Sequence, residues 1–587
     1  MPSAVRRGSA EKRATSPGLT CLSQLRGLSR KGIRECDFPL RKVRDVPQHA
    51  SPLRLFQNAP FRALWTATLA SNLGGLIQAV GAGWMMTSIA TSSDMVALVQ
   101  ASTALPIMLF SLPAGALADG LDRRKIMLTA QIFMLLVSVA LTVCAYTDLL
   151  TPWLLLGFTF LIGCGTALHN PSWQSSMGDI VPREDLPSAV LVNSMGFNLM
   201  RSVGPAIGGA VVAAIGAAAA FAINAASYLT LIIALLRWTP LRPAATLPRE
   251  AFAPAVAAGL RYVAMSPNLV KVMFRGFLFG FTAIAVLALL PLVARNLLGG
   301  SALTYGIMLG CFGFGAIGGA FASGPLRERY SNETIVRSAF LVFSAAVVVL
   351  GLSREIWLSC LTLLFCGACW VMALSLFNAT VQLSTPRWVV GRALALYQTA
   401  TFGGMAGGSW LWGTIADSHG SDRALLISGA WLVLGALVGL RLPLPEFEGN
   451  NFDPLDRFSE PQLRLDLKYR SGPIMIMVDY DIAQENVPAF LAAMAARRRI
   501  RIRDGARQWA LLRDLENPDI WTETYHVATW IEYVRHNQRR TKADAESAER
   551  LRALHKGDRP PHVHRMIERQ TVPLRDDMPL KDHPDMH

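Results

Sequence analysis

Residues 95–146 read MVALVQASTALPIMLFSLPAGALADGLDRRKIMLTAQIFMLLVSVALTVCAY, two long apolar stretches separated by one short charged loop. A helix needs about 20 apolar residues to cross the hydrocarbon core of a bilayer, and each stretch is long enough. Further apolar stretches of similar length alternate with polar connections from Phe61 to Leu442. This pattern predicts an all-α polytopic membrane protein over the central part of the chain.

The apolar stretches fall into two groups of six. In the first half, residues 61–238, the predicted spans are Phe61–Ile89, Met95–Ala118, Ile126–Tyr146, Trp153–Met177, Ala189–Ile215 and Ala218–Trp238. In the second half, residues 268–442, they are Asn268–Leu297, Tyr305–Pro325, Thr334–Leu352, Ile356–Leu383, Arg392–Asp417 and Ala424–Leu442. A polar, Pro-rich cytoplasmic linker at residues 239–267 joins the halves within a twelve-span transporter domain, residues 51–445. Transporters built from such repeats bind substrate between the halves, near mid-membrane.

The composition agrees with a membrane protein. Of the 587 residues 52% are hydrophobic and 17% are charged, whereas soluble proteins average about 25% charged. The formal net charge is +15, and basic residues are concentrated in residues 1–50, which lack an apolar core. We expect residues 1–50 to be a disordered basic extension, a targeting stretch or the product of a start codon assigned too early. A basic flank beside a span indicates orientation and lipid contact rather than nucleic-acid binding.

Positive charges predict the orientation of the spans. Lys and Arg gather in every second loop, as at Arg123–Lys125 after the second span and Arg237–Arg249 after the sixth, and the exceptions in the second half are Arg295, Arg354 and Arg423. The opposite connections, such as Thr91–Asp94 and Tyr146–Pro152, are short and poor in these residues. Because Lys and Arg are enriched in cytoplasmic loops, we expect a multi-pass protein of the cell inner (cytoplasmic) membrane with both termini in the cytoplasm.

After Pro445 the pattern changes to short alternating runs. Residues 446–470 are a predicted linker, residues 471–572 a cytosolic domain, and residues 573–587 a tail. Strands are predicted at Pro473–Ile482, Arg507–Asp514, Thr522–Trp530 and Val563–Gln570, and helices at Asn486–Arg499, Thr529–Arg540 and Ala543–His555. The order strand-helix-strand-strand-helix-strand is typical of a ferredoxin-like α+β fold.

The loop at residues 115–125, Gly-Ala-Leu-Ala-Asp-Gly-Leu-Asp-Arg-Arg-Lys, is the most specific short motif in the chain. It resembles the signature between the second and third spans of the major facilitator superfamily, Gly-x-Leu-small-Asp-basic-x-Gly-Arg-Arg/Lys. Gly120 and Asp122 depart from that pattern. The resemblance implies a conformational latch motif made of Gly115, Asp119, Arg123 and Arg124. The alternative is an ordinary basic loop beside a span.

Other segments extend the resemblance, among them Phe61-Arg-x-Leu-Trp65, Asn170-Pro171-x-x-Gln174 and, near the C-terminus, Arg503-Asp504-Gly505. They are similar to the enterobactin-exporter-like branch of the superfamily, also called transmembrane secretion effectors. The appended domain of that branch is itself similar to small antibiotic-biosynthesis monooxygenases. The resemblance covers residues 51–572 and implies a fold and a branch, without implying a substrate.

The fifth span contains a glycine-rich motif, Gly204-Pro205-x-x-Gly208-Gly209. It is similar to the antiporter motif of exporters in the superfamily, although Met200 stands where that motif has a further glycine. The resemblance implies directional export. Small residues and proline would equally serve close helix packing and a bend, so both interpretations stay open.

Arg201 lies about 18 Å into the fifth span, at 1.5 Å per residue. A cation at that depth costs about 3 kcal/mol or more, and it normally faces water or a partner. We expect Arg201 to bind an anionic group of the substrate. The alternative is an arginine that reaches to the cytoplasmic surface.

Several uncharged polar residues also fall inside the predicted spans, whereas no Asp or Glu lies deep in any of them. They are candidates for the substrate or ion cavity, and each could instead bridge helices: Asn72, Gln78, Gln131, Asn198, Asn378, Gln382 and Gln398. If protons drive transport, the carriers are the peripheral Asp119 or Asp179, or His169 in the fourth span. A hydrogen-bonded structural histidine is the alternative at position 169.

These observations predict a secondary active transporter that exports a small organic compound, siderophore-like or drug-like, by alternating access with the proton as coupling ion. No Gly-x-x-x-x-Gly-Lys-Ser/Thr motif for ATP binding is present, and we expect no cofactor, metal or catalytic residue. The alternatives are an uptake carrier on the same fold and a membrane-tethered monooxygenase. The partners are the lipid bilayer, the small-molecule substrate and, through the C-terminal domain, a second copy of the chain. His562-x-His564 and His555 are the residues in that domain that could bind a metal.

Overall fold

The computed structural model describes residues 52–182, 185–239, 252–386, 388–445, 455, 458–556 and 559–568. All of them belong to one compact unit, Ser51–His587. The predictions for residues 1–50 and for the tail at residues 573–587 lie outside the described residues, as does most of the connection at residues 446–457.

Within the described residues, ten helices are long and apolar enough to cross a membrane. They are α2 (Ser93–Gly120), α3 (Arg123–Tyr146), α4 (Pro152–Ile180), α5 (Leu186–Ile215), α6 (Ala217–Arg237), α8 (Pro267–Leu292), α9 (Ala302–Arg329), α10 (Asn332–Leu352), α11 (Ile356–Leu383) and α13 (Ser421–Arg441). Two further long helices, α1 (Ala59–Ile89) and α12 (Val390–His419), are not among these ten. The twelve-span count therefore stays a prediction.

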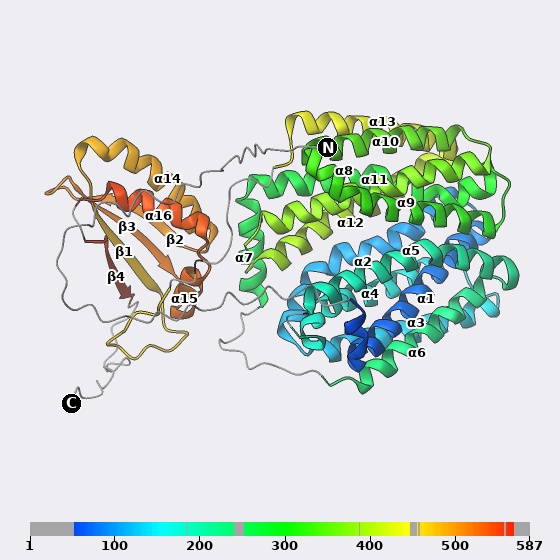
Figure 1. The fold of residues 1–587 in the computed structure, drawn as a ribbon, viewed down its shortest axis with the longest axis horizontal. Coiled ribbons are helices and arrows are strands. Elements are labelled where there is room, and N and C mark those ends of the chain that lie inside the picture. Colours follow the sequence, from blue (N-terminus) through cyan, green and yellow to red (C-terminus); the bar gives the residue numbers. More distant parts are fainter. Residues whose placement is uncertain are drawn as a thin grey trace, which may run out of the picture. The chain divides into compact units, whose positions relative to one another are not determined.

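The long helices form two bundles, α1–α6 and α8–α13 (Figure 1). The bundles meet where α2 packs along α12 and where α5 packs along α9. Glycines permit the second contact, because a Cβ atom on Gly209 of α5 would lie 2.7 Å from the Cα atom of Gly306 on α9. The halves can approach this closely only where both helices lack side chains.

A helix that the sequence analysis did not anticipate, α7 (Phe252–Ala264), lies in the linker between the two halves. Its buried residues are spaced for one helical face: Ala255, Ala258, Gly259, Tyr262 and Val263. The prolines before it made the whole segment resemble a connection without structure.

A buried ion pair anchors the second half. Arg275 of α8 is fully buried, and its Nη1 atom lies 3.0 Å from Glu333 Oε2 at the start of α10. The same nitrogen donates to the carbonyl of Leu442 after α13, at 3.1 Å. The pair therefore connects α8, α10 and the end of α13, where the chain leaves the membrane domain.

The C-terminal domain is a four-stranded antiparallel sheet with helices packed against it (Figure 1). Its elements are β1 (Ile474–Asp481), α14 (Val487–Arg503), β2 (Arg507–Arg513), β3 (Ile520–Val527), α15 (Trp530–Gln538), α16 (Lys542–Leu554) and β4 (His562–Ile567), and the strand order is β2-β3-β1-β4. Alternate residues of β1 are buried against Phe490 and Met494 of α14. The predicted helix at Asn486–Arg499 was too short, because Arg501 is buried beside Glu523 and extends α14 to Arg503.

Candidate transport site

A cavity of about 500 Å³ lies between the two halves. Its walls come from α2 and α4 of the first half, α11 and α12 of the second half, and α7 of the linker. Its polar residues are Ser111, Asn170, Gln174, Ser175, Asn378, Gln382, Arg392 and Gln398. Among the described residues that line it, Arg392 carries the only charged side chain and none is a carboxylate.

Two pairs of amides define the polar wall. Asn170 and Gln174 are one helical turn apart on α4, and Asn378 and Gln382 have the same spacing on α11. Residues four apart share a helix face, which places each pair on the cavity side. Gln382 Nε2 donates to Asn378 Oδ1. Because amides both donate and accept hydrogen bonds, this wall suits uncharged polar groups on a largely apolar molecule.

The halves are in contact beyond the cavity, toward the start of α2 and the end of α12. There the backbone N–H of Ser93 donates to Asp417 Oδ1 at 2.8 Å. A Cβ atom on Gly413 of α12 would lie 2.7 Å from the Cβ atom of Ala97 on α2. The cavity is therefore displaced toward the opposite end of the helices, where α2 ends and α12 begins.

The loop motif after α2 ties together helices of the first half. Arg123 Nη1 forms an ion pair with Asp179 Oδ2 of α4 at 2.9 Å and donates to the Ser175 carbonyl at 2.9 Å. Arg124 donates to the last carbonyls of α6, to Leu235 at 2.8 Å and Leu236 at 2.7 Å. A cation at a helix C-terminus stabilises unpaired carbonyls. Gly115 lines the cavity, whereas the Asp119 side chain lies outside the described part of the chain.

The glycine motif of α5 faces two neighbouring helices. Cβ atoms on Gly204 and Gly208 would lie 3.0 Å from Leu76 Cβ and Ile77 Cα of α1, respectively. Gly306 of α9 approaches the other side, where its own Cβ would lie 2.8 Å from the Pro205 carbonyl oxygen. These residues lie where α5 contacts both α1 and the second half, a position compatible with packing and with rocking.

Three other predicted cavity residues, Gln78, Gln131 and His169, bridge helices in this structure. Gln78 Oε1 of α1 accepts from Asn224 Nδ2 of α6 and from Ser138 Oγ of α3, the latter at 3.2 Å. Gln131 Nε2 of α3 lies 3.4 Å from His169 Nδ1 of α4, and both side chains are buried. These contacts match the helix-bridging alternative that the sequence left open.

The remaining predicted residues lie away from this cavity. Asn198 Nδ2 donates to the carbonyl of Ser194 on its own helix at 2.9 Å. Arg201 is half-buried, and its side chain has no hydrogen-bond or ion-pair partner among the described residues. Neither these two nor Asn72 contributes to the described wall of the cavity. A contact of Arg201 with an anionic substrate stays a prediction.

Comparison with known families decides the class of protein. The family model that matches is described as transmembrane secretion effector, and the match covers residues 50–571. The chain belongs to this family of major facilitator transporters. The match extends over the C-terminal domain as well as the membrane domain. The family and its relatives are transporters and not enzymes, and the alternative of a membrane-tethered monooxygenase is not supported.

Curated relatives and solved structures agree with the family. The chain is 21% identical over 387 residues to macrolide efflux protein A of Streptococcus pyogenes, covering 64% of this chain and 94% of the relative. It is 26% identical over 366 residues to the staphyloferrin A transporter of Staphylococcus aureus, covering 61% and 89%. A bacterial homologue of the human lysosomal transporter Spinster superposes with a TM-score of 0.54 at 14% identity, covering 66% and 97%. That likeness shows a shared fold for the membrane domain.

One further group of side chains could hold a metal ion in this family member. His562 Nδ1 lies 2.9 Å from His564 Nε2, which lies 3.0 Å from Asp479 Oδ2. Asp479 and His562 are partners across β1 and β4, which brings the three side chains to one sheet face. The sequence pointed to the two histidines. The sequence did not indicate Asp479, because that residue lies next to the two histidines only through the pairing of β1 with β4.

Proposed function

We propose that this transporter exports a small amphipathic organic compound by alternating access. The observation that carries the proposal is the amide-lined cavity between the two halves, with the halves in contact beyond it. A cavity enclosed by both halves and displaced toward one end is what one conformation of a rocking carrier requires. Contact at the opposite end must then open as the cavity closes.

The substrate class follows from the wall and from the relatives. Five amides provide hydrogen-bond donors and acceptors next to apolar residues such as Ile107 and Phe402, and Arg392 adds the single described charge of the wall. Uncharged polar groups on a large apolar frame fit this lining. The name of one relative, macrolide efflux protein A, supports export of an antibiotic-like compound, and the name staphyloferrin A transporter supports a siderophore-like compound as the alternative substrate.

The cavity faces the cytoplasm in the proposed orientation. The basic residues Arg123, Arg124 and Arg392 lie at its end of the helices, and cytoplasmic loops are enriched in Arg and Lys. Both termini and the C-terminal domain then lie in the cytoplasm, with the membrane domain in the cell inner membrane. Twelve spans in a six-plus-six arrangement complete this topology, with α1 and α12 as the two additional spans.

Proton coupling belongs to the same proposal. Asp179 is the described carboxylate that best combines accessibility with a partner, since it is 23% exposed and paired with Arg123. Protonation of Asp179 would release Arg123 and loosen α3 from α4. Asp119 and His169 are the other carriers under consideration.

The strand order β2-β3-β1-β4 and the alternation of strands and helices support a ferredoxin-like fold for the C-terminal domain. Residues 446–470 are the linker before it, and residues 471–572 are the domain. Pairing of two chains through this domain remains part of the proposal.

The deciding experiment is transport by the full chain reconstituted in lipid vesicles. With an imposed pH gradient, we expect erythromycin or staphyloferrin A to accumulate inside vesicles in which the cytoplasmic side of the transporter faces the external medium. Gln382→Ala, which removes one amide from the wall, should raise the KM severalfold. Gln57→Ala, which changes an exposed amide far along the chain from the cavity residues, serves as the matched control.

The outcomes separate the alternatives. Accumulation driven in the reverse direction would favour an uptake carrier. Flux without dependence on the pH gradient would remove the proton as coupling ion. If Gln382→Ala and Gln57→Ala behaved alike for both compounds, the amide wall would not be the substrate site.

A further inference from the structure

The C-terminal domain contains a second cavity, of about 920 Å³, between its sheet and its helices. Apolar and aromatic side chains from every layer form much of its wall: Phe458, Val478, Tyr480, Tyr525, Tyr533 and Leu551. Arginines from α14 and from the turn after α15 also line it, namely Arg497, Arg501 and Arg540. An apolar space with cationic groups inside a small domain differs from an ordinary core.

The positive charge in this cavity exceeds the negative charge beside it. Glu523 of β3 is fully buried and serves two arginines, with Arg497 Nε 2.9 Å from Oε2 and Arg501 Nε 3.1 Å from Oε1. Burial alone would raise the pKa of Glu523, but the two guanidinium groups outweigh it and lower that pKa. One ionised carboxylate therefore balances one of two arginine charges.

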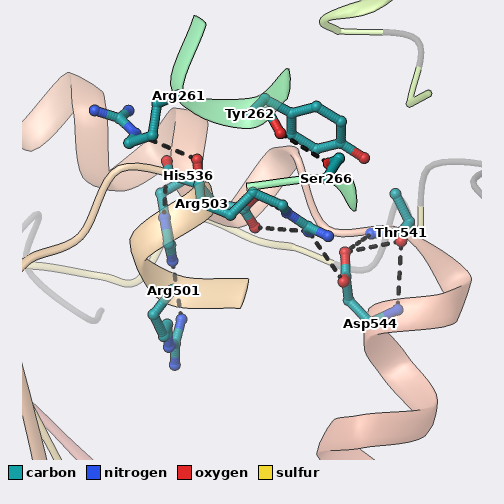
Figure 2. Close-up of polar contacts among 9 residues, drawn as sticks. Arg261, Tyr262, Ser266, Arg501, Arg503, His536, Thr541 and Asp544 are labelled. Carbon is teal, nitrogen blue, oxygen red and sulfur yellow. Dashed lines mark hydrogen bonds and ion pairs between the residues drawn. The ribbon is translucent and has the colours of Figure 1, made fainter. Parts of the chain in front are cut away.

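The other acidic and basic side chains around the cavity do not neutralise its excess positive charge. Arg501 Nη1 lies 3.0 Å from His536 Nε2, and because arginine cannot accept a hydrogen bond, that nitrogen is the acceptor of a neutral imidazole. Asp504 and Asp544 also line the cavity, and both pair with Arg503, Asp504 at 2.9 Å and Asp544 at 3.1 Å (Figure 2 labels Asp544). The third carboxylate of the wall, Glu549, is outnumbered by two further arginines that line it, Arg552 and Arg565.

Arg540 lacks a counter-ion in the described part of the domain. It lines the cavity, and no described carboxylate forms an ion pair with its guanidinium. Burial, together with the nearby charge of Arg501, lowers the pKa of Arg540 to about 10. A partly buried cation without a partner destabilises the folded domain unless an anion joins it. A guanidinium also presents a planar fork of donors that matches a carboxylate.

We propose that this cavity binds an organic anion, a carboxylate on an aromatic or similarly apolar frame, with Arg540 as its counter-ion. The carboxylate lies against Arg540, and the apolar frame lies among Tyr480, Tyr525 and Tyr533. This site is separate from the transport cavity, and binding there does not depend on the direction or substrate of transport.

The proposed site adjoins the membrane domain through α14. Asp504 in the cavity wall pairs with Arg503, whose carbonyl accepts from Arg261 Nε of α7 at 3.3 Å (Figure 2). The same α7 contributes Ala255 and Val256 to the transport cavity. The wall of this cavity is therefore linked to the linker helix of the transporter through Asp504 and Arg503.

The test uses the full chain in nanodiscs of zwitterionic phospholipid, with salicylate as the anionic probe and salicylamide as its neutral counterpart. By calorimetry we expect saturable salicylate binding that weakens at least tenfold in Arg540→Gln and partly recovers in Arg540→Lys. Salicylamide should bind at least tenfold more weakly than salicylate. Arg507→Gln removes an exposed arginine of the same domain outside the cavity, and it should leave affinity within twofold of wild type.

Folding is checked separately, because Arg540→Gln removes an uncompensated charge and should leave the thermal midpoint unchanged or raised. Equal salicylate affinity in Arg540→Gln and wild type, or absence of saturable binding to wild type, would overturn the proposal. Equal binding of the two probes would do the same. Loss of salicylate binding in Gln382→Ala would assign the probe to the transport cavity and equally overturn it.

Discussion

The guanidinium of Arg503 on α14 lies 5.1 Å from the centroid of the Tyr262 ring on α7, so the C-terminal domain contacts the linker between the two halves (Figure 2). Arg539, just after α15, stacks 4.2 Å from the ring centroid of Trp388, which precedes α12. Tyr262 and Trp388 themselves meet edge to face at 5.7 Å. Two arginines of the C-terminal domain thus contact two aromatic rings in segments that lead into the transport cavity.

Replacing Tyr262 by Leu should loosen this contact while keeping an apolar side chain. A cation–π contact contributes about 0.5–2 kcal/mol, which corresponds to roughly a twofold to thirtyfold change in local opening. In hydrogen exchange on the full chain, we expect faster exchange at the end of α14, near Arg503. Arg499→Gln, on an exposed position of the same helix, should leave exchange there unchanged. Unaltered exchange in Tyr262→Leu would mean that the ring contributes nothing to docking.

Because His536 is buried, we expect the stability of the C-terminal domain to depend on pH. Its burial, together with the charge of Arg501, lowers the pKa of His536 well below its ordinary value. Below about pH 6.5 the unfolded chain gains a proton that the folded domain does not, so stability falls as the pH falls. The expected loss between pH 7.5 and pH 5.5 is about 1.4 kcal/mol.

Hydrogen-exchange protection in β3, corrected for the intrinsic pH dependence of exchange, measures this loss. We expect protection to fall about tenfold in wild type between the two pH values. His536→Gln, whose amide can still accept from Arg501, should show a much flatter profile. A wild-type profile as flat as that of the variant would mean that His536 is not the titrating group.

Gly439 should be intolerant of any side chain, because of the ion pair beside it. A Cβ atom there would lie 2.2 Å from Glu333 Oε1 and 2.9 Å from Arg275 Nη1. Displacing one partner leaves a buried charge unpaired, which costs about 3–5 kcal/mol. Gly439→Ala should therefore lower the thermal midpoint of the detergent-solubilised protein by several degrees. Gly407→Ala is the control, since the nearest atom to its Cβ would be 3.9 Å away.

The sequence predicted the membrane helices well because their cause is local. In hydrocarbon each backbone group must be paired within its own segment, so apolar length alone identifies a helix. The prediction at Ile126–Tyr146 lies within α3, which starts at Arg123. The same reasoning missed α7, whose apolar face is short and follows a Pro-rich stretch, and it ended α14 early at Arg499. Arg501 is buried against Glu523 of β3, and helix propensity cannot predict such a tertiary contact.

The site was harder to predict than the helices. The sequence identified Asn378 and Gln382 as polar residues inside a span, but Gln78 and Gln131 gave the same signal and bridge helices instead. In the sequence, an amide that lines a cavity cannot be told from one that bridges two helices. The two cases differ only in which helix faces come together in the folded protein. The spacing of four between Asn170 and Gln174, repeated at Asn378 and Gln382, was the available clue.

A charge exchange can test the pairing of Arg123 with Asp179. Arg123→Asp places two carboxylates together and should slow erythromycin transport about fivefold, in line with about 1 kcal/mol for a partly exposed pair. The double variant Arg123→Asp with Asp179→Arg restores opposite charges and should recover much of the rate. If the double variant transported no faster than Arg123→Asp, the pair would not be the functional contact of Arg123.

The close contact of α5 with α9 leads to the last prediction. A Cβ atom on Gly306 would lie 2.6 Å from Gly209 Cα, so Gly306→Val must push the two halves apart at this end. In a cysteine-free background, Ala97→Cys reports the opening, because Ala97 is buried against α12 in the closed arrangement. We expect faster labelling of that cysteine by a membrane-impermeant maleimide, together with loss of transport. Gly318→Val lies on the same helix with no atom within 4 Å of its Cβ, and it should change neither. Equal labelling in the two variants would show that the glycine contact does not hold the halves together.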